Sequence, residues 1–167
     1  MADRVTVAGW VGSTNLGDEL LFRILRDLLG ARGVAVGGPS VDPAGTAAAH
    51  GTEAHGHLNP SALRHSLVAS DAFVFGPGGL LQDETGIWNL PYHLRRIRMA
   101  RRAGLPWAGI GLGADGLTTE RGRGQVRKAL VGHTAIAVRD EASFDALREL
   151  GVERIVRTAD LAFLAEV

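Results

Sequence analysis

Residues 71–83 read DAFVFGPGGLLQD, a short apolar run that passes directly into a turn rich in glycine. Aromatic and β-branched side chains at 73–75 favour a buried strand, because they pack well on a pleated surface. Glycine adopts backbone angles that other residues avoid, so the glycines within 76–79 mark the end of that strand. The segment therefore predicts a buried strand that delivers a glycine-rich loop to one edge of a sheet.

The same pattern recurs along the chain, with a helical pattern between most successive strands. The predicted strands cover residues 5–10, 34–36, 71–75, 106–110, 134–138 and 155–156, and the predicted helices cover 18–29, 60–68, 87–103, 119–130 and 141–150. Residues 37–59 have little periodicity and predict a loop. Strands that alternate with helices at this spacing indicate a parallel sheet. We predict one α/β domain over residues 1–167, with a Rossmann-like parallel sheet and helices on both faces.

Composition narrows the class of protein. The chain has 167 residues, 46% of them apolar, with 18 basic and 18 acidic residues. Such a balance offers no bulk attraction to nucleic acid or to an anionic membrane, so we expect no nucleic-acid partner. The absence of cysteine excludes disulfides, thiolate metal sites and a cysteine nucleophile. The sequence shows no signal-peptide or membrane-spanning pattern, and we expect a cytoplasmic protein.

Candidate ligand-binding residues lie where predicted strands end, because open parallel sheets bind ligands at the carboxyl ends of their strands. The first such loop contains Gly12, Asn15 and Gly17 and leads into a helix whose first turn holds Asp18. Glycines allow a close approach of the backbone, and a helix N-terminus offers N–H groups to an anion. A tight connection in which Asp18 caps the helix stays the alternative.

The loop after the strand at 71–75 is the second candidate. Gly78 and Gly79 are adjacent, and their backbone amides form the kind of arrangement that binds anions. Gln82 and Asp83 follow and could bind the hydroxyl groups of a sugar. A purely structural turn is the alternative.

Two further loops reach the same edge. Gly111 lies in the glycine-rich turn at 109–113, and Arg139 and Asp140 follow the predicted strand at 134–138. Arginine suits bidentate binding of a carboxylate or phosphate, so Arg139 is a candidate anion clamp. A structural Arg–Asp pair is the alternative.

In this order, the loops resemble the motifs of the polysaccharide pyruvyl transferase family. The matching segments are GWVGSTNLGDE at 9–19, GPGGLLQD at 76–83, GIGLG at 109–113, VRDEAS at 138–143 and TADLAF at 158–163. Pro77 stands where the family has glycine, and proline removes one backbone N–H from the second turn. The resemblance spans essentially the whole chain.

The resemblance implies a fold similar to the N-terminal domain of a GT-B-like protein, with the family's C-terminal domain absent from this chain. It implies transfer of a pyruvyl group from phosphoenolpyruvate to a sugar hydroxyl of a cell-surface glycan, which gives a ketal, with no cofactor besides this donor substrate. We therefore expect Asp18, Asp83 and Arg139 to be the catalytic groups, with Arg139 on the donor. The expected substrate-binding residues are Gly12, Asn15, Gly17, Gly78, Gly79, Gln82, Gly111 and Asp140.

The same resemblance indicates which binding partners to expect. The acceptor would be a sugar or a lipid-linked glycan, and peripheral contact with a membrane, a homo-oligomer or a separate C-terminal partner chain are each compatible with the sequence. The alternatives to a transferase are a non-catalytic module that binds a glycan or nucleotide, and an inactive fragment that self-associates.

Arginines and histidines outside these motifs have their own interpretations. Arg95, Arg98 and Arg102 share one face of the predicted helix at 87–103 and could attract an anionic lipid-linked glycan or nucleic acid. A solvated helix face is the commoner explanation of such a run. The histidines between 50 and 57 have no cysteine beside them, and we predict no metal site.

Overall fold

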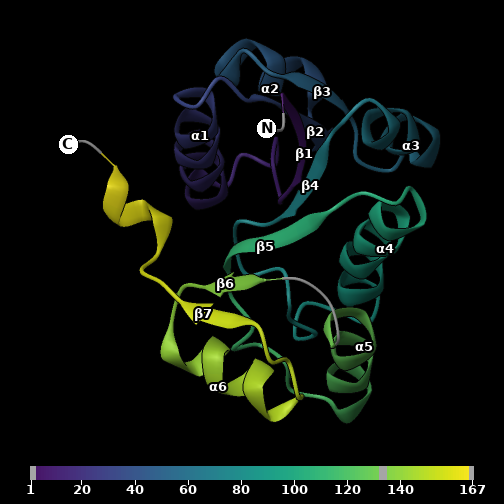
Figure 1. Ribbon diagram of the computed structural model, residues 1–167, viewed down its shortest axis with the longest axis vertical. Coiled ribbons are helices and arrows are strands. Elements are labelled where there is room, and N and C mark those ends of the chain that lie inside the picture. Colours follow the sequence, from purple (N-terminus) through teal and green to yellow (C-terminus); the bar gives the residue numbers. More distant parts are fainter. Residues whose placement is uncertain (1–2, 132–134, 166–167) are drawn as a thin grey trace.

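The computed structural model describes residues 3–131 and 135–165 (Figure 1). Its strands are β1 (Arg4–Ala8), β2 (Ala35–Ser40), β3 (Glu53–Gly56), β4 (Ala72–Phe75), β5 (Trp107–Leu112), β6 (Ile136–Val138) and β7 (Ile155–Arg157). Its helices are α1 (Leu16–Gly30), α2 (Pro43–His50), α3 (Pro60–Val68), α4 (Asn89–Arg102), α5 (Glu120–Leu130) and α6 (Glu141–Glu149), with a final 3₁₀ turn η1 (Leu161–Leu164). Within these residues the strands form one sheet in the order β3-β2-β1-β4-β5-β6-β7, and each neighbouring pair is parallel. The predicted Rossmann-like α/β fold is confirmed.

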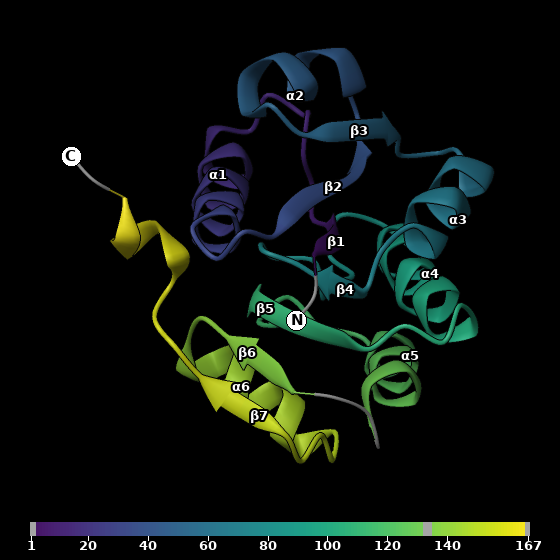
Figure 2. The ribbon, with the colours of Figure 1, turned by 45° about the horizontal axis from the view of Figure 1, so that its top comes forward.

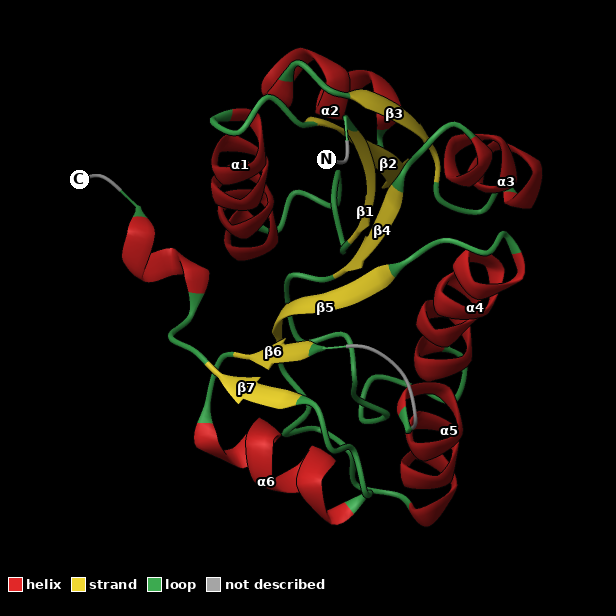
Figure 3. Cartoon of the chain, in the orientation of Figure 1, coloured by secondary structure: helices red, strands yellow, loops and turns green. Residues whose placement is uncertain are grey.

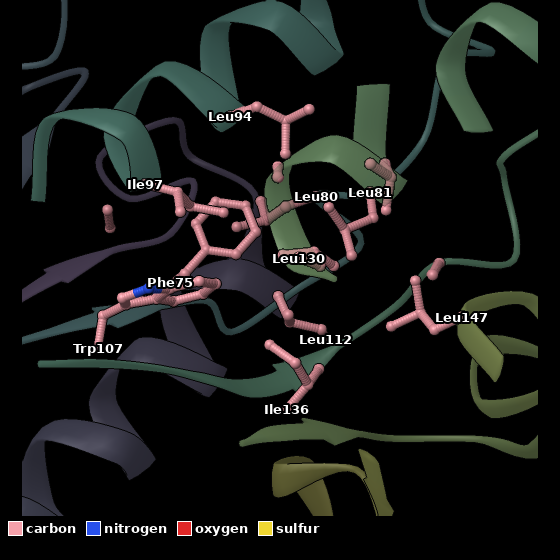
Figure 4. Close-up of a cluster of buried hydrophobic side chains, with 14 of the residues drawn as sticks. Phe75, Leu80, Leu81, Leu94, Ile97, Trp107, Leu112, Leu130, Ile136 and Leu147 are labelled. Carbon is pink, nitrogen blue, oxygen red and sulfur yellow. The ribbon is translucent and has the colours of Figure 1, made fainter. Parts of the chain in front are cut away.

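Helices cover both faces of this sheet, as predicted. Figure 1 shows α3, α4 and α5 along one side and α1 on the other. On the first side Phe75 of β4 packs in a buried cluster with Leu94 of α4 and Leu130 of α5 (Figure 4). On the second side Val7 of β1 packs in a separate cluster with Phe22 of α1. Successive side chains of a strand point to opposite faces, so two covered faces require strands that are apolar along their whole length.

The prediction of a loop at residues 37–59 is wrong. The segment contains most of β2, then the helix α2, then β3, and β3 is an edge strand of the sheet with β2 beside it (Figure 3). The strand signal is weak because β2 has glycine where its neighbours leave no room. A Cβ atom at Gly38 would lie 2.1 Å from the carbonyl oxygen of Val7, and one at Gly37 would lie 2.9 Å from that of Glu53. Small side chains hide α2 in the same way, although Asp42 caps its start by accepting from the N–H of Gly45.

Other predicted boundaries differ by a few residues. β1 ends at Ala8 and not at residue 10, and α1 begins at Leu16, two residues before its predicted start. The turn η1 was not predicted. The first residue of the strand predicted at 134–138, residue 134, lies outside the described residues, and the described strand β6 begins at Ile136.

The strand order places a reversal point in the middle of the sheet. β1 and β4 pair directly, but the chain leaves β1 for α1 on one face and leaves β4 for α4 on the other (Figure 2). Open α/β sheets bind ligands outside the carboxyl ends of the strands at such a point.

Of the helices in the described part of the chain, none combines the length and the apolar character needed to cross a bilayer.

Candidate functional site

The loops after β1, β4, β5 and β6 meet at the carboxyl edge of the sheet. A Cβ atom at Gly78 would lie 2.9 Å from Oδ1 of Asp18, and one at Gly113 would lie 3.0 Å from Nη2 of Arg139. A Cβ atom at Gly79 would lie 3.9 Å from the same nitrogen. A carboxylate and a guanidinium group therefore both lie close to the turn at 76–79, at positions where glycine leaves space for them. The structure brings together Asp18, Gly78, Gly79 and Arg139, which are four of the residues singled out from the sequence.

Arg139 follows β6, with 29% of its side chain exposed. Its Nε lies 3.4 Å from Oδ2 of Asp140, and its Nη1 lies 3.4 Å from Oδ2 of Asp160. Charge-assisted hydrogen bonds are commonly 2.7–2.9 Å long, so both contacts are loose. Asp160 belongs to the TADLAF segment but was not among the site residues expected from the sequence. Only the return of the chain after β7 places its carboxylate beside Arg139.

Asp18 lies partly buried in the first turn of α1. Burial, and next the negative charge of Glu19, raise the pKa of Asp18 above its usual value, against a smaller opposing effect of Arg139. A carboxylate with a raised pKa is better matched to accepting a proton near neutral pH than an ordinary surface aspartate. The alternative that Asp18 caps α1 is wrong, because Oδ1 of Asn15 accepts from the N–H of Gly17 at 3.0 Å and supplies the cap.

Gly12 shapes the loop that precedes Asp18. Its φ of 77° lies in the left-handed region, and a Cβ atom there would lie 2.2 Å from Oγ of Ser40. Its N–H donates to Oε1 of Glu19 at 2.6 Å, and Oε2 of Glu19 lies 2.8 Å from Nε2 of His50. These contacts fix the loop against β2 and α2, two elements that the sequence did not reveal in full.

The turn after β4 presents fewer unbonded amides than the sequence suggested. The N–H of Gly78 donates to the carbonyl of Gly111 at 3.1 Å, and the N–H of Gly113 donates to the carbonyl of Gly78 at 3.0 Å. These bonds tie the turn to the end of β5. Gly111 has a φ of 63°, and a Cβ atom there would lie 3.2 Å from Cβ of Pro77. Among the described residues, the N–H of Gly79 has no acceptor, so it is the amide of this turn that is free for an anion, and Gly79 itself lies close to Arg139.

Asp83 and Gln82 lie further along the same loop and bind protein groups. The carboxylate of Asp83 accepts from the N–H and hydroxyl groups of Thr118 and Thr119, three of these bonds measuring 2.9–3.2 Å. Burial raises the pKa of Asp83, but the hydrogen bonds from Thr119 and Thr118 outweigh it and hold the pKa below its usual value. Gln82 bonds Thr85 through both ends of its amide group. Catalysis by Asp83 and sugar binding by Gln82 stay predictions.

Asp140 caps α6, because its Oδ1 accepts from the N–H of Ser143 at 2.7 Å. Burial raises the pKa of Asp140, but the bonds from Ser143 and the charge of Arg139 outweigh it and lower the pKa below its usual value. The Arg–Asp pair considered from the sequence as a structural alternative is present at 3.4 Å. A role of Asp140 in substrate binding stays a prediction.

A second polar cluster, which the sequence did not indicate, lies beside β1 on the same edge. Arg96 is only 3% exposed, and its Nη1 donates to the carbonyl of Gly9 at 3.1 Å. Its Nη2 donates to the hydroxyl of Tyr92, which lies 2.7 Å from Nδ1 of His57. The ring of Trp10 packs edge-on against His57 and Tyr92. The spacing of four residues between Tyr92 and Arg96 was the signal available in the sequence, since such residues share a helix face.

Within residues 3–131 and 135–165, no group of three histidine, aspartate or glutamate side chains is arranged to hold a metal ion. The histidines between 50 and 57 instead contact neighbouring side chains and backbone. His50 pairs with Glu19, and His57 contacts Tyr92.

Comparison with known protein families places most of this chain in one of them. The sequence model of a family described as polysaccharide pyruvyl transferase matches residues 15–166, which is most of the chain. The matched region includes Asp18, the turn at 76–79 and Arg139. No curated protein matches the chain.

Proposed function

Since the chain belongs to the polysaccharide pyruvyl transferase family, we propose that it transfers a pyruvyl group from phosphoenolpyruvate to a sugar hydroxyl of a glycan, forming a ketal. The observation that carries this proposal is that Asp18 and Arg139 both lie close to the turn at 76–79. A proton acceptor near an anion-binding group suits this reaction.

The donor carries a phosphate and a carboxylate, and the proposed anion-binding groups are the guanidinium of Arg139 and the N–H of Gly79. Both are charge-compatible donors for an oxyanion. The contacts of Arg139 to Asp140 and Asp160 are long, at 3.4 Å each, so a bound anion can replace them with shorter bonds.

In the proposed reaction, one sugar hydroxyl oxygen adds to C2 of phosphoenolpyruvate while C3 takes up a proton. A second hydroxyl oxygen then bonds to C2, the bond from C2 to the phosphate oxygen breaks, and inorganic phosphate leaves. Each hydroxyl loses one proton, so one proton ends on C3 and the other on phosphate. Asp18, with its raised pKa, is the proposed acceptor of a hydroxyl proton.

Ketal formation from phosphoenolpyruvate and a lipid-linked or nucleotide-linked sugar tests the proposal, with mass spectrometry of the sugar and phosphate release as readouts. One series uses the chain alone, and another adds a family C-terminal domain as a separate chain. Arg139→Gln and Asp18→Asn should each lower turnover by about 100-fold or more, the range typical for loss of one catalytic group. Asp145→Asn, an exposed change on α6, is the matched control. No ketal in either series contradicts the proposal.

A binding module without turnover is the second candidate. It is favoured by the bond from the N–H of Gly78 to Gly111 and by Pro77, because both leave fewer amides to stabilise charge that develops on the donor during the reaction, while Arg139 can still bind it. Calorimetric titration with phosphoenolpyruvate, with Arg139→Ala as control, separates the two candidates. Binding that depends on Arg139 but gives no ketal supports the module.

A further inference from the structure

The charges of this electrically balanced chain are unevenly distributed. The helices α3, α4 and α5 carry ten of the 18 basic residues, with one on α3, five on α4 and four on α5. They carry one of the 18 acidic residues, Glu120. All three helices lie on the same side of the sheet (Figure 1). These three helices are therefore strongly basic, a feature that the net charge of zero conceals.

The groove between α3 and α4 concentrates this charge. It has a volume of about 760 Å³, and its lining includes Arg64, Arg95, Arg98 and Arg102 but no acidic residue. Among the described residues, none of these four arginines forms an ion pair. Four unpaired guanidinium groups around one groove require an anionic partner or solvent.

Apolar side chains accompany the arginines. Leu67 and Met99 line the groove, and Val68 at its margin is 73% exposed. Leu58, just before α3, is 74% exposed. Arginine side chains keep their charged groups at a polar surface while their stems cover apolar area. Arginines together with exposed apolar side chains therefore suit a partner that has an anionic surface and an apolar layer beneath it.

We propose that the face formed by α3 and α4 docks on the surface of a bilayer that contains anionic phospholipids. Guanidinium groups bind lipid phosphates, and Val68 and Leu58 enter the boundary between headgroups and acyl chains. A single-stranded nucleic acid fits this face less well because the groove lining has no aromatic side chain on which a base could stack, and a duplex offers no apolar layer to Leu58 and Val68.

The docking face lies beside the candidate site and does not contain it. α4 begins at the carboxyl edge of the sheet, where Tyr92 and Arg96 reach the end of β1, and Arg98 and Arg102 lie toward the other end of this helix. The inference goes beyond the proposed transfer reaction and holds or fails independently of it.

Co-sedimentation of the full chain with vesicles of phosphatidylcholine, with and without phosphatidylglycerol, tests the proposal. The test variant is the triple change Arg64→Gln, Arg98→Gln and Arg102→Gln. The matched control changes three exposed arginines elsewhere, Arg23→Gln, Arg32→Gln and Arg154→Gln, and so alters the net charge equally. Circular dichroism checks that each variant is folded.

We expect binding only to vesicles with phosphatidylglycerol, weakened by salt. The groove variant should bind on the order of 100-fold more weakly, since each basic residue at an anionic surface contributes about fivefold. The control variant should lose much less. Absence of binding, equal binding to neutral vesicles, equal loss in both variants, or tighter binding to duplex DNA than to anionic vesicles would each overturn the proposal.

Discussion

Burial of His93 on α4 makes the stability of this fold depend on pH. The residue is 3% exposed, and burial, followed by the charge of Arg96, lowers its pKa from 6.5 to about 3. The folded state therefore keeps His93 neutral at pH values where the unfolded chain protonates it. The unfolded state binds the extra proton between pH 6.5 and about 3, so stability falls as the pH falls through this window.

The size of the effect follows from the two pKa values. Lowering the pH from about 8 to about 5 should cost about 2 kcal/mol of unfolding free energy through His93 alone. The loss at this pH hardly depends on the folded pKa, because any value below about 4 leaves His93 neutral in the native state. The loss depends instead on the pKa of His93 in the unfolded chain, which is its ordinary value of 6.5.

Urea denaturation at both pH values, followed by tryptophan fluorescence, measures this loss. Other titrating groups also make the stability of the wild-type protein depend on pH. The effect of His93 is therefore the difference between the loss of unfolding free energy in the wild type and the loss in the His93→Gln variant. Glutamine does not titrate and keeps an acceptor for Arg96, whose Nη1 lies 3.4 Å from Nδ1 of His93. The variant should lose about 2 kcal/mol less than wild type on acidification. His65→Gln, an exposed change on α3, serves as control. Equal losses in wild type and His93→Gln would refute the reasoning.

Three further changes have defined outcomes. Gly113→Ala puts a methyl group 3.0 Å from Nη2 of Arg139 and should weaken phosphoenolpyruvate binding about tenfold in calorimetry, with a loss of stability of about 1–3 kcal/mol from the local crowding. Gly38→Ala places a methyl group 2.1 Å from the carbonyl of Val7, and thermal denaturation should show a loss of about 3 kcal/mol or more. Asp83→Ala removes the acceptor for Thr118 and Thr119 and should lower the unfolding free energy by about 1–2 kcal/mol, measured by urea denaturation.

Much of the fold could be predicted because its signals are local. The run at 73–75 is apolar on both faces since α1 covers one side of β4 and α4 the other, and that pattern is visible in the sequence. β2 was only partly predicted, because its glycines reflect close contacts with Val7 and Glu53 on neighbouring strands. The reason for a glycine at such a position lies outside its own segment.

The loops that carry the candidate site could be predicted from the sequence, but the contacts between their residues could not. Asn15 and Asp140 appeared as ligand candidates, and the structure shows that both also cap helices. Asp160 was not assigned to the site, since its link to Arg139 requires the chain to return after β7. Arg96 was not singled out from the sequence, since it is one of five arginines on the helix predicted at 87–103, and only its packing against β1 shows that it is buried.

The sequence by itself determined the alternation of strands, glycine turns and helices, and the order of the motifs that identify the family, because these depend on residues close together in the chain. The tertiary structure decided which of those residues meet. Asp18, Gly78 and Arg139 come from three loops, and they are neighbours because β1 pairs with β4 while β6 lies two strands beyond. Strand order likewise places α3 beside α4 and gathers the arginines of two helices around one groove. Such proximity is a property of the packed sheet, and no single segment encodes it.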